Sequence, residues 1–164
     1  MTAERAHQRA DLIGSLARIW RHDPEYRFGQ MLMQSLHASL DLLPVGAPIA
    51  GIADGQVRAA LSERWAWESS RKSAIAPPPY WDTETHTGRT FMNGLPRDPG
   101  RITPFLETLA QAWERHPDLS LCALIGPTVE TLGGLGGIED GQLRRRLARL
   151  AASPGVDSPP TSAS

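Results

Sequence analysis

The chain has 164 residues, of which 17 are basic and 18 acidic, giving a formal net charge of −1 at pH 7. This length fits one domain that buries a core without disulfides or metals, and the balanced charge argues against a dedicated nucleic-acid-binding protein. A single cysteine, a polar N-terminus and the absence of an apolar run of about 18 residues predict a cytoplasmic protein without a membrane span.

Two helices are predicted near the N-terminus. The first carries an apolar stripe at i, i+3, i+4 and i+7, formed by Ile13, Leu16, Ala17 and Trp20. Pro24 disfavours helical geometry in the residue before it, so this helix is expected to end near His22. A second helical stripe follows at Phe28, Met31, Leu32 and Leu36.

A third helix is predicted to begin at Asp54. An aspartate before an apolar-periodic segment is a favoured N-cap, because its carboxylate accepts from exposed amides and meets the positive end of the helix dipole. Asp140 stands at the matching place in a later segment, so both residues are interpreted as caps of the helices that they precede.

Residues 66–101 have a different character, because proline and glycine interrupt them repeatedly. This segment is predicted to be irregular, or to contain a short strand. In a strand, Asp82, Glu84 and His86 would share one face, and with nearby Arg89 they are the candidate catalytic residues. The alternative interpretation of this group is a polar surface loop, and no metal ligand set is assigned.

The sequence after residue 101 repeats the first part. Leu16, Ala17, Trp20 and Pro24 recur at a constant spacing as Leu109, Ala110, Trp113 and Pro117. The segments 52–61 and 138–147 share Ile, Asp-Gly-Gln, Arg and Leu at matching positions. In this second part Thr103 is expected to cap a helix, and Gly126-Pro127 to end the next one early.

These patterns predict a mainly α fold, in which two pseudo-symmetric three-helix units pack together into one compact domain. Trp20, Pro24, Trp113, Pro117, Asp54 and Asp140 are the structural motif of this arrangement. The expected boundaries are 1–65 for the first unit, 66–101 for the connecting segment, 102–150 for the second unit and 151–164 for a disordered tail.

The motif Trp20-x-x-x-Pro24-Glu25-x-Arg27-x-x-Gln30-Met31 resembles one found in short bacterial and phage proteins of unknown function. The chain resembles a tandem of two such units, over residues 9–61 and 102–150. The resemblance implies a bacterial protein and brings no activity with it. Ser120 and Ala123 replace the motif's arginine and glutamine in the second copy.

The polar pair Arg27 and Gln30 borders an apolar stripe, and either pairs within the chain or binds a partner. For a structural role, Glu25 or Asp54 is the expected partner of Arg27. The other candidate binding residues are the aromatics Trp67, Tyr80 and Trp81, because tryptophan and tyrosine anchor many interfaces.

The favoured function is a protein-binding module or regulatory adaptor with no catalytic activity and no cofactor. Its partner is expected to be another protein, with a homo-oligomer left open. The first alternative is a small metal-dependent or acid/base enzyme that uses the Asp82, Glu84 and His86 segment. The second is a nucleic-acid accessory protein that uses the basic residues of the last helix.

Overall fold

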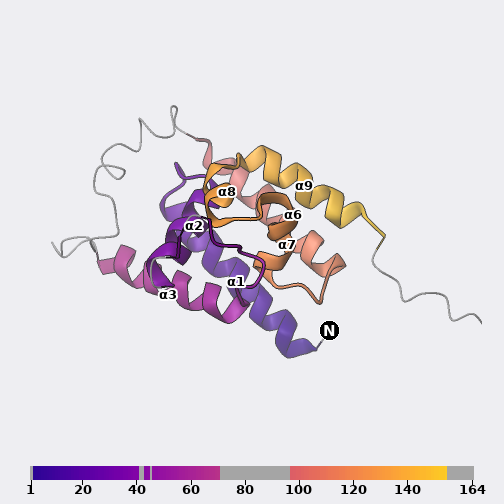
Figure 1. The fold of residues 1–164 in the computed structure, drawn as a ribbon, viewed down its shortest axis with the longest axis horizontal. Helices are drawn as coiled ribbons and strands as arrows, with labels where there is room; N and C mark the ends of the chain where they lie inside the picture. Colours follow the sequence, from indigo (N-terminus) through magenta and orange to yellow (C-terminus); the bar gives the residue numbers. More distant parts are fainter. Residues whose placement is uncertain (1, 41–42, 45, 71–96, 155–164) are drawn as a thin grey trace, which may run out of the picture.

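A computed structural model describes residues 2–40, 43–44, 46–70 and 97–154 (Figure 1). The regular elements within these ranges are all helical, which confirms a mainly α fold. They are α1 (Ala3–His22), α2 (Phe28–Ser39), α3 (Asp54–Ser70), the short 3₁₀ helix η1 (Pro99–Arg101), α6 (Ile102–Arg115), α7 (Leu121–Val129), α8 (Leu132–Gly137) and α9 (Asp140–Ala152).

The two tryptophans of the repeated motif lie at equivalent chain reversals. α1 ends at His22, as Pro24 predicted, and α6 ends at Arg115. The indole Nε1 of Trp20 donates to the carbonyl of Tyr26 at 2.8 Å, and that of Trp113 donates to the carbonyl of Leu119, also at 2.8 Å. Each buried indole therefore satisfies its only polar atom and fixes the turn that leads into the next helix.

Two predicted helix boundaries are wrong. Thr103 is not a cap, because α6 already begins at Ile102, directly after η1. Gly126-Pro127 does not end its helix, since α7 continues through both residues to Val129. Proline removes one backbone hydrogen bond there, but the apolar face of α7 is buried, and this packing outweighs the local preference.

The two halves of the chain, 2–70 and 97–154, interlock. α1 packs against α3 of its own half and α6 of the other, and α2 packs against α3 and α8 (Figure 1). A Cβ atom built on Gly29 of α2 would lie 1.9 Å from the carbonyl oxygen of Leu135 in α8. The absence of a side chain at Gly29 is therefore what allows these two backbones to touch.

The centre of the core is an aromatic cluster built from both halves. The ring centroid of Trp20 lies 5.4 Å from that of Phe28 and 5.1 Å from that of Phe105. The rings of Phe28 and Phe105 are 4.7 Å apart. All three side chains are at most 1% exposed, so the core belongs to the whole chain and not to either half.

Several predictions fall outside the described residues. They include the short strand proposed within residues 66–101, of which only 66–70 and 97–101 are described, and all but the first four residues of the predicted disordered tail. No helix in the described part is long and apolar enough to cross a membrane.

Candidate functional site

The carboxylates of Asp54 and Asp140 cap helices of the opposite half, not their own. Asp140 accepts a hydrogen bond from the first amide of α2, that of Phe28, at 2.7 Å. Asp54 accepts one from the first amide of α7, that of Leu121, also at 2.7 Å. The expectation that each residue caps the helix it precedes is therefore wrong: each is the first residue of that helix and reaches across to another. We call the contact of Asp140 with the start of α2 and its surroundings the Asp140 corner. The contact of Asp54 with the start of α7 and its surroundings is the Asp54 corner.

At the Asp140 corner, an arginine joins the carboxylate to the preceding turn. Arg101 Nε donates to Asp140 Oδ2 at 2.8 Å. Its Nη2 donates to the carbonyls of Pro24 and Tyr26 at 2.7 and 2.8 Å. The Arg101 guanidinium carbon also lies 5.3 Å from the centroid of the Trp20 ring. This arginine thus ties α9, the α1–α2 turn and the aromatic core together.

A second carboxylate, that of Glu139, completes this corner. It accepts from Arg27 and from Arg97, each at 3.1 Å. Burial raises the pKa of Glu139, but the hydrogen bonds and charges of Arg97 and Arg27 outweigh it and hold the pKa below its ordinary value. The partner of Arg27 is therefore Glu139, where Glu25 or Asp54 was expected.

The candidate binding residues Arg27 and Gln30 are both engaged within the chain. Arg27 Nη2 also donates to the carbonyl of Gly136 at 3.0 Å. The side-chain oxygen of Gln30 accepts from the backbone amide of Arg27 at 3.2 Å, and Gln30 is only 7% exposed. Together they close the start of α2, which is a capping role.

At the Asp54 corner, Arg9 takes the position that Arg101 takes at the other. It donates to the carbonyls of Trp113 and Pro117, and its guanidinium carbon lies 4.8 Å from the centroid of the Trp113 ring. Burial lowers the pKa of Arg9, and the charge of Arg5 lowers it further, while the charges of Asp54 and Asp118 raise it; the net pKa lies below the ordinary value.

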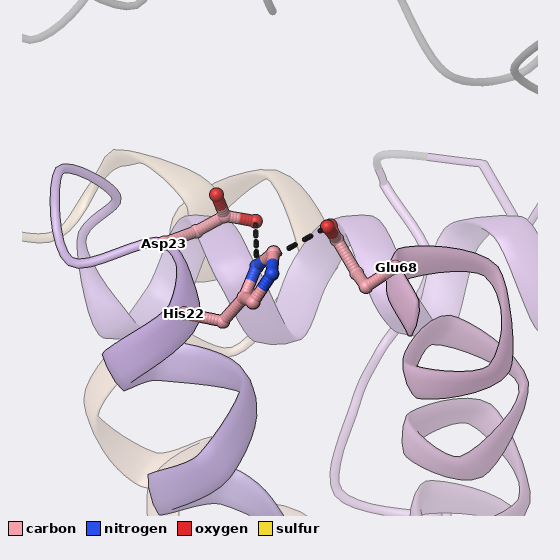
Figure 2. Close-up of side chains that lie close together, drawn as sticks. All are labelled: His22, Asp23 and Glu68. Carbon is pink, nitrogen blue, oxygen red and sulfur yellow. Dashed lines mark ion pairs between the residues drawn. The ribbon is translucent and has the colours of Figure 1, made fainter. Parts of the chain in front are cut away.

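A group of titratable residues lies elsewhere, between the end of α1 and the last turns of α3 (Figure 2). His22 Nδ1 is 3.7 Å from a carboxylate oxygen of Asp23 and 3.4 Å from one of Glu68. Both carboxylates are buried, whereas His22 is 41% exposed. The sequence placed Asp23 and Glu68 far apart, and only the packing of α3 on α1 brings them together.

The ligand atoms of these three side chains lie within 4.8 Å of one another, which is close enough to share one metal ion. However, a buried guanidinium group already lies among them. Arg64 Nη2 is 3.8 Å from a carboxylate oxygen of Asp23 and 3.8 Å from one of Glu68. Arg64 compensates the buried negative charge, and its fixed positive charge opposes a divalent cation at the same place. The cluster is best described as a buried ion network that joins α1 to α3.

Next to this network, a hollow of about 200 Å³ opens between α2 and α3. Its lining residues are Ser35, Ala38, Ser39, Ala60, Glu63, Arg64 and Trp67. Arg64 Nη1 donates to the carbonyl of Met31 at 3.0 Å and to the hydroxyl of Ser35 at 3.3 Å, so this charged side chain of the lining is fixed to α2. Among the predicted binding residues that the structure describes, Trp67 lines this hollow.

Its near neighbour Trp65 lies in a different environment. The guanidinium carbon of Arg18 stacks 4.5 Å from the Trp65 ring, and the His22 ring meets it edge-on at 5.8 Å. Two residues along a helix point in very different directions, so Trp65 packs against α1 while Trp67 lines the hollow.

The cysteine of α7 and two arginines of α9 have structural roles. Cys122 is buried, and burial raises the pKa of its thiol to about 12, so it is a poor nucleophile. In α9, Arg144 donates to the hydroxyl of Thr108 at 3.2 Å, and Arg146 donates to the carbonyl of Thr128. These contacts direct part of the basic cluster of the last helix toward the protein.

The remaining candidates, Tyr80, Trp81, Asp82, Glu84, His86 and Arg89, lie outside the described residues. Comparisons of the chain with protein-family models, with curated proteins and with solved structures gave no match. The roles of the candidate sites are therefore inferred from their geometry and chemistry alone.

Proposed function

We propose that the protein is a non-catalytic protein-binding module, and that the hollow between α2 and α3 receives one side chain of its partner. The volume of this hollow carries the proposal. At about 200 Å³, it is smaller than the roughly 300–1,000 Å³ of pockets that enclose cofactors and small-molecule substrates. It has the scale of a pocket that accepts a single anchoring side chain at an interface.

The chemistry of the lining supports the same function. Trp67 offers a wide, partly buried aromatic surface, and tryptophan is enriched among the residues that dominate binding energies. The small residues Ala38 and Ala60 leave room beside it, while Ser39 and Glu63 supply more exposed polar groups. Apolar and polar groups are likewise combined in protein interfaces.

Binding is favoured over catalysis because the candidate chemical groups in the described residues have structural roles. Arg64 neutralises Asp23 and Glu68, and Cys122 is buried with a raised pKa. A nucleic-acid accessory role is disfavoured by the formal net charge of −1 and by the inward contacts of Arg144 and Arg146.

We further propose that the chain is a tandem duplication of one helical unit, the unit of the short bacterial and phage proteins that it resembles. The paired contacts support this idea. Each tryptophan of the motif donates to a carbonyl six residues later, each motif aspartate caps a helix of the other half, and an arginine lies over each tryptophan ring. A pseudo-twofold relation would generate these pairs.

The binding function is tested with two tryptophans of one helix. A photo-reactive amino acid at Ser39 would crosslink the partner, and the same amino acid at exposed Arg145 on α9 would report background capture. The protein enriched only at position 39 would then be purified and titrated by calorimetry against the wild type, Trp67→Ala and Trp65→Ala.

We expect Trp67→Ala to weaken the affinity at least about tenfold with little change in melting temperature. Trp65→Ala should lower the melting temperature, because Arg18 and His22 pack on that ring, and should leave the affinity unchanged. The proposal fails if both variants bind like the wild type, or if positions 39 and 145 capture the same proteins.

A further inference from the structure

The two corners differ in how their outer arginines are satisfied. At the Asp140 corner, Arg97 donates to the Glu139 carboxylate and Arg144 donates to the Thr108 hydroxyl. Two arginines of the Asp54 corner correspond to them. Arg5 precedes Arg9 by four residues, as Arg97 precedes Arg101, and Arg58 matches Arg144 in the repeated segments 52–61 and 138–147. Within the residues that the structure describes, neither guanidinium has a hydrogen bond or an ion pair, and the Nε atom of Arg58 is nevertheless buried.

Both of these arginines line one small cavity. It is lined by Arg5, Gln8, Arg9, Leu12, Asp54, Arg58 and Trp113, and its volume is about 20 Å³. A cavity of roughly 10–15 Å³ already holds a water-sized group. The space therefore admits one polar group of about the size of a water molecule or a single carboxylate oxygen, in a lining that includes three arginines.

The negative charge at this cavity is smaller than the positive charge. Asp54 is the one acidic side chain in the lining, and its Oδ1 is occupied by the amide of Leu121. Asp118 acts on Arg9 electrostatically but does not line the cavity. A buried donor without an acceptor is costly, so an anion from outside would be stabilised here.

The other corner shows which chemistry satisfies such arginines. Glu139 immediately precedes Asp140, and its carboxylate accepts from both Arg27 and Arg97. The residue that immediately precedes Asp54 is Ala53, which offers no acceptor. The Asp54 corner thus lacks the carboxylate that Glu139 supplies at the Asp140 corner.

We infer that the cavity at the Asp54 corner binds a carboxylate group from outside the chain, held by Arg5 and Arg58. Toward Arg5, the group has the role that the Glu139 carboxylate has toward Arg97 at the Asp140 corner. The ligand is a free small carboxylate or the acidic side chain of another molecule. This site shares no lining residue with the hollow between α2 and α3, so it is independent of the proposed function.

The test supplies the missing carboxylate in two ways. Melting temperatures are measured in increasing sodium acetate and in sodium chloride at equal ionic strength. In parallel, the ¹H–¹⁵N signal of the Arg58 Nε–H group is followed by NMR. The variants are Ala53→Glu, which places a carboxylate within the chain, its neutral control Ala53→Gln, and Arg58→Met, which removes the cation.

We expect acetate to raise the wild-type melting temperature above the chloride curve and to shift the Arg58 signal to saturation. Ala53→Glu should melt at a higher temperature than Ala53→Gln and should lose the response to acetate. Arg58→Met should lose the response while its circular dichroism stays that of a folded helical protein. The Ala53→Gln variant should respond to acetate like the wild type.

The inference is overturned if acetate and chloride act alike on the wild type, or if Ala53→Glu responds to acetate as strongly as Ala53→Gln. N-acetylglutamic acid α-amide, compared with the corresponding glutamine derivative, separates the two sources. A shift of the Arg58 signal with the glutamate compound alone shows that an acidic side chain fits. A shift with acetate and with neither derivative assigns the site to small free carboxylates.

Discussion

The Asp140 corner and the Asp54 corner share several contacts, but the Asp140 corner has additional ion pairs. In both, an aspartate from one half caps a helix of the other, and an arginine lies over a tryptophan while bonding to the backbone of the next turn. Only the Asp140 corner adds Glu139, which gathers Arg27 and Arg97. The two corners therefore share their backbone caps and differ in the charged groups around them.

The second helices of the two halves differ in the same way. Gly29 of α2 touches the backbone of α8, whereas the matching residue of α7 is Cys122, whose side chain is fully buried. One helix therefore uses a missing side chain to approach its neighbour, and the other uses a small one to fill space. Substitutions at Gly29, at the two capping aspartates and at Glu139 test how much the two halves differ.

The largest expected effect is at Gly29. Gly29→Ala places a Cβ atom 1.9 Å from a backbone carbonyl oxygen of α8, and that backbone cannot yield as a side-chain end would. We expect a loss of about 3 kcal/mol in the free energy of unfolding, measured by urea denaturation. Gly14→Ala in α1 is the control, since nothing lies within 4 Å of its added Cβ. It should be neutral or stabilise by up to about 1 kcal/mol. Equal effects at both glycines would contradict the close approach of α2 and α8.

The next effect distinguishes the two caps. Asp140→Ala removes the acceptor of the Phe28 amide and also the ion-pair partner of Arg101, so a loss of about 2 kcal/mol is expected. Asp54→Ala removes the acceptor of the Leu121 amide at a more exposed position and should cost about 1 kcal/mol. Thermal and urea denaturation of both variants measure the difference. A larger loss at Asp54 would reverse the ranking of the corners.

The smallest effect concerns the charge of Glu139. Because Arg97 and Arg27 lower its pKa in the folded state, its carboxylate stabilises the fold above the ordinary carboxyl pKa of about 4. That contribution is lost as the pH falls through the lowered folded-state pKa. Glu139 is 56% exposed, so solvent screening keeps the contribution below about 1 kcal/mol.

Urea denaturation of the wild type and Glu139→Gln across a pH series measures this term. The wild type should be more stable at pH 7, and the difference should vanish in acid and shrink at about 1 M salt. A difference that grows as the pH falls would mean that the protonated carboxyl group is the stabilising form. The Asp54 corner, which has Ala53 at the matching place, provides no such pH-dependent pair.

The helices themselves follow from local patterns. The apolar stripe up to Trp20 and the proline at position 24 were sufficient to predict where α1 ends, because helical periodicity and proline geometry act within a few residues. α6 ends at Arg115, at the corresponding distance from Trp113 and Pro117. Local rules failed at Pro127, where burial of α7 outweighs the preference of one residue.

The candidate sites depended on information that local patterns lack. Local sequence patterns were enough to predict that Asp54 and Asp140 stand at helix starts and that Trp67 is a candidate anchor. They did not predict that each aspartate caps a helix of the other half, that Glu139 is the partner of Arg27, or that Glu68 lies beside His22 and Asp23. The physical reason is range: helix propensity and capping preference act over a few neighbouring residues, whereas these partners are brought together by burial of one aromatic core that both halves share.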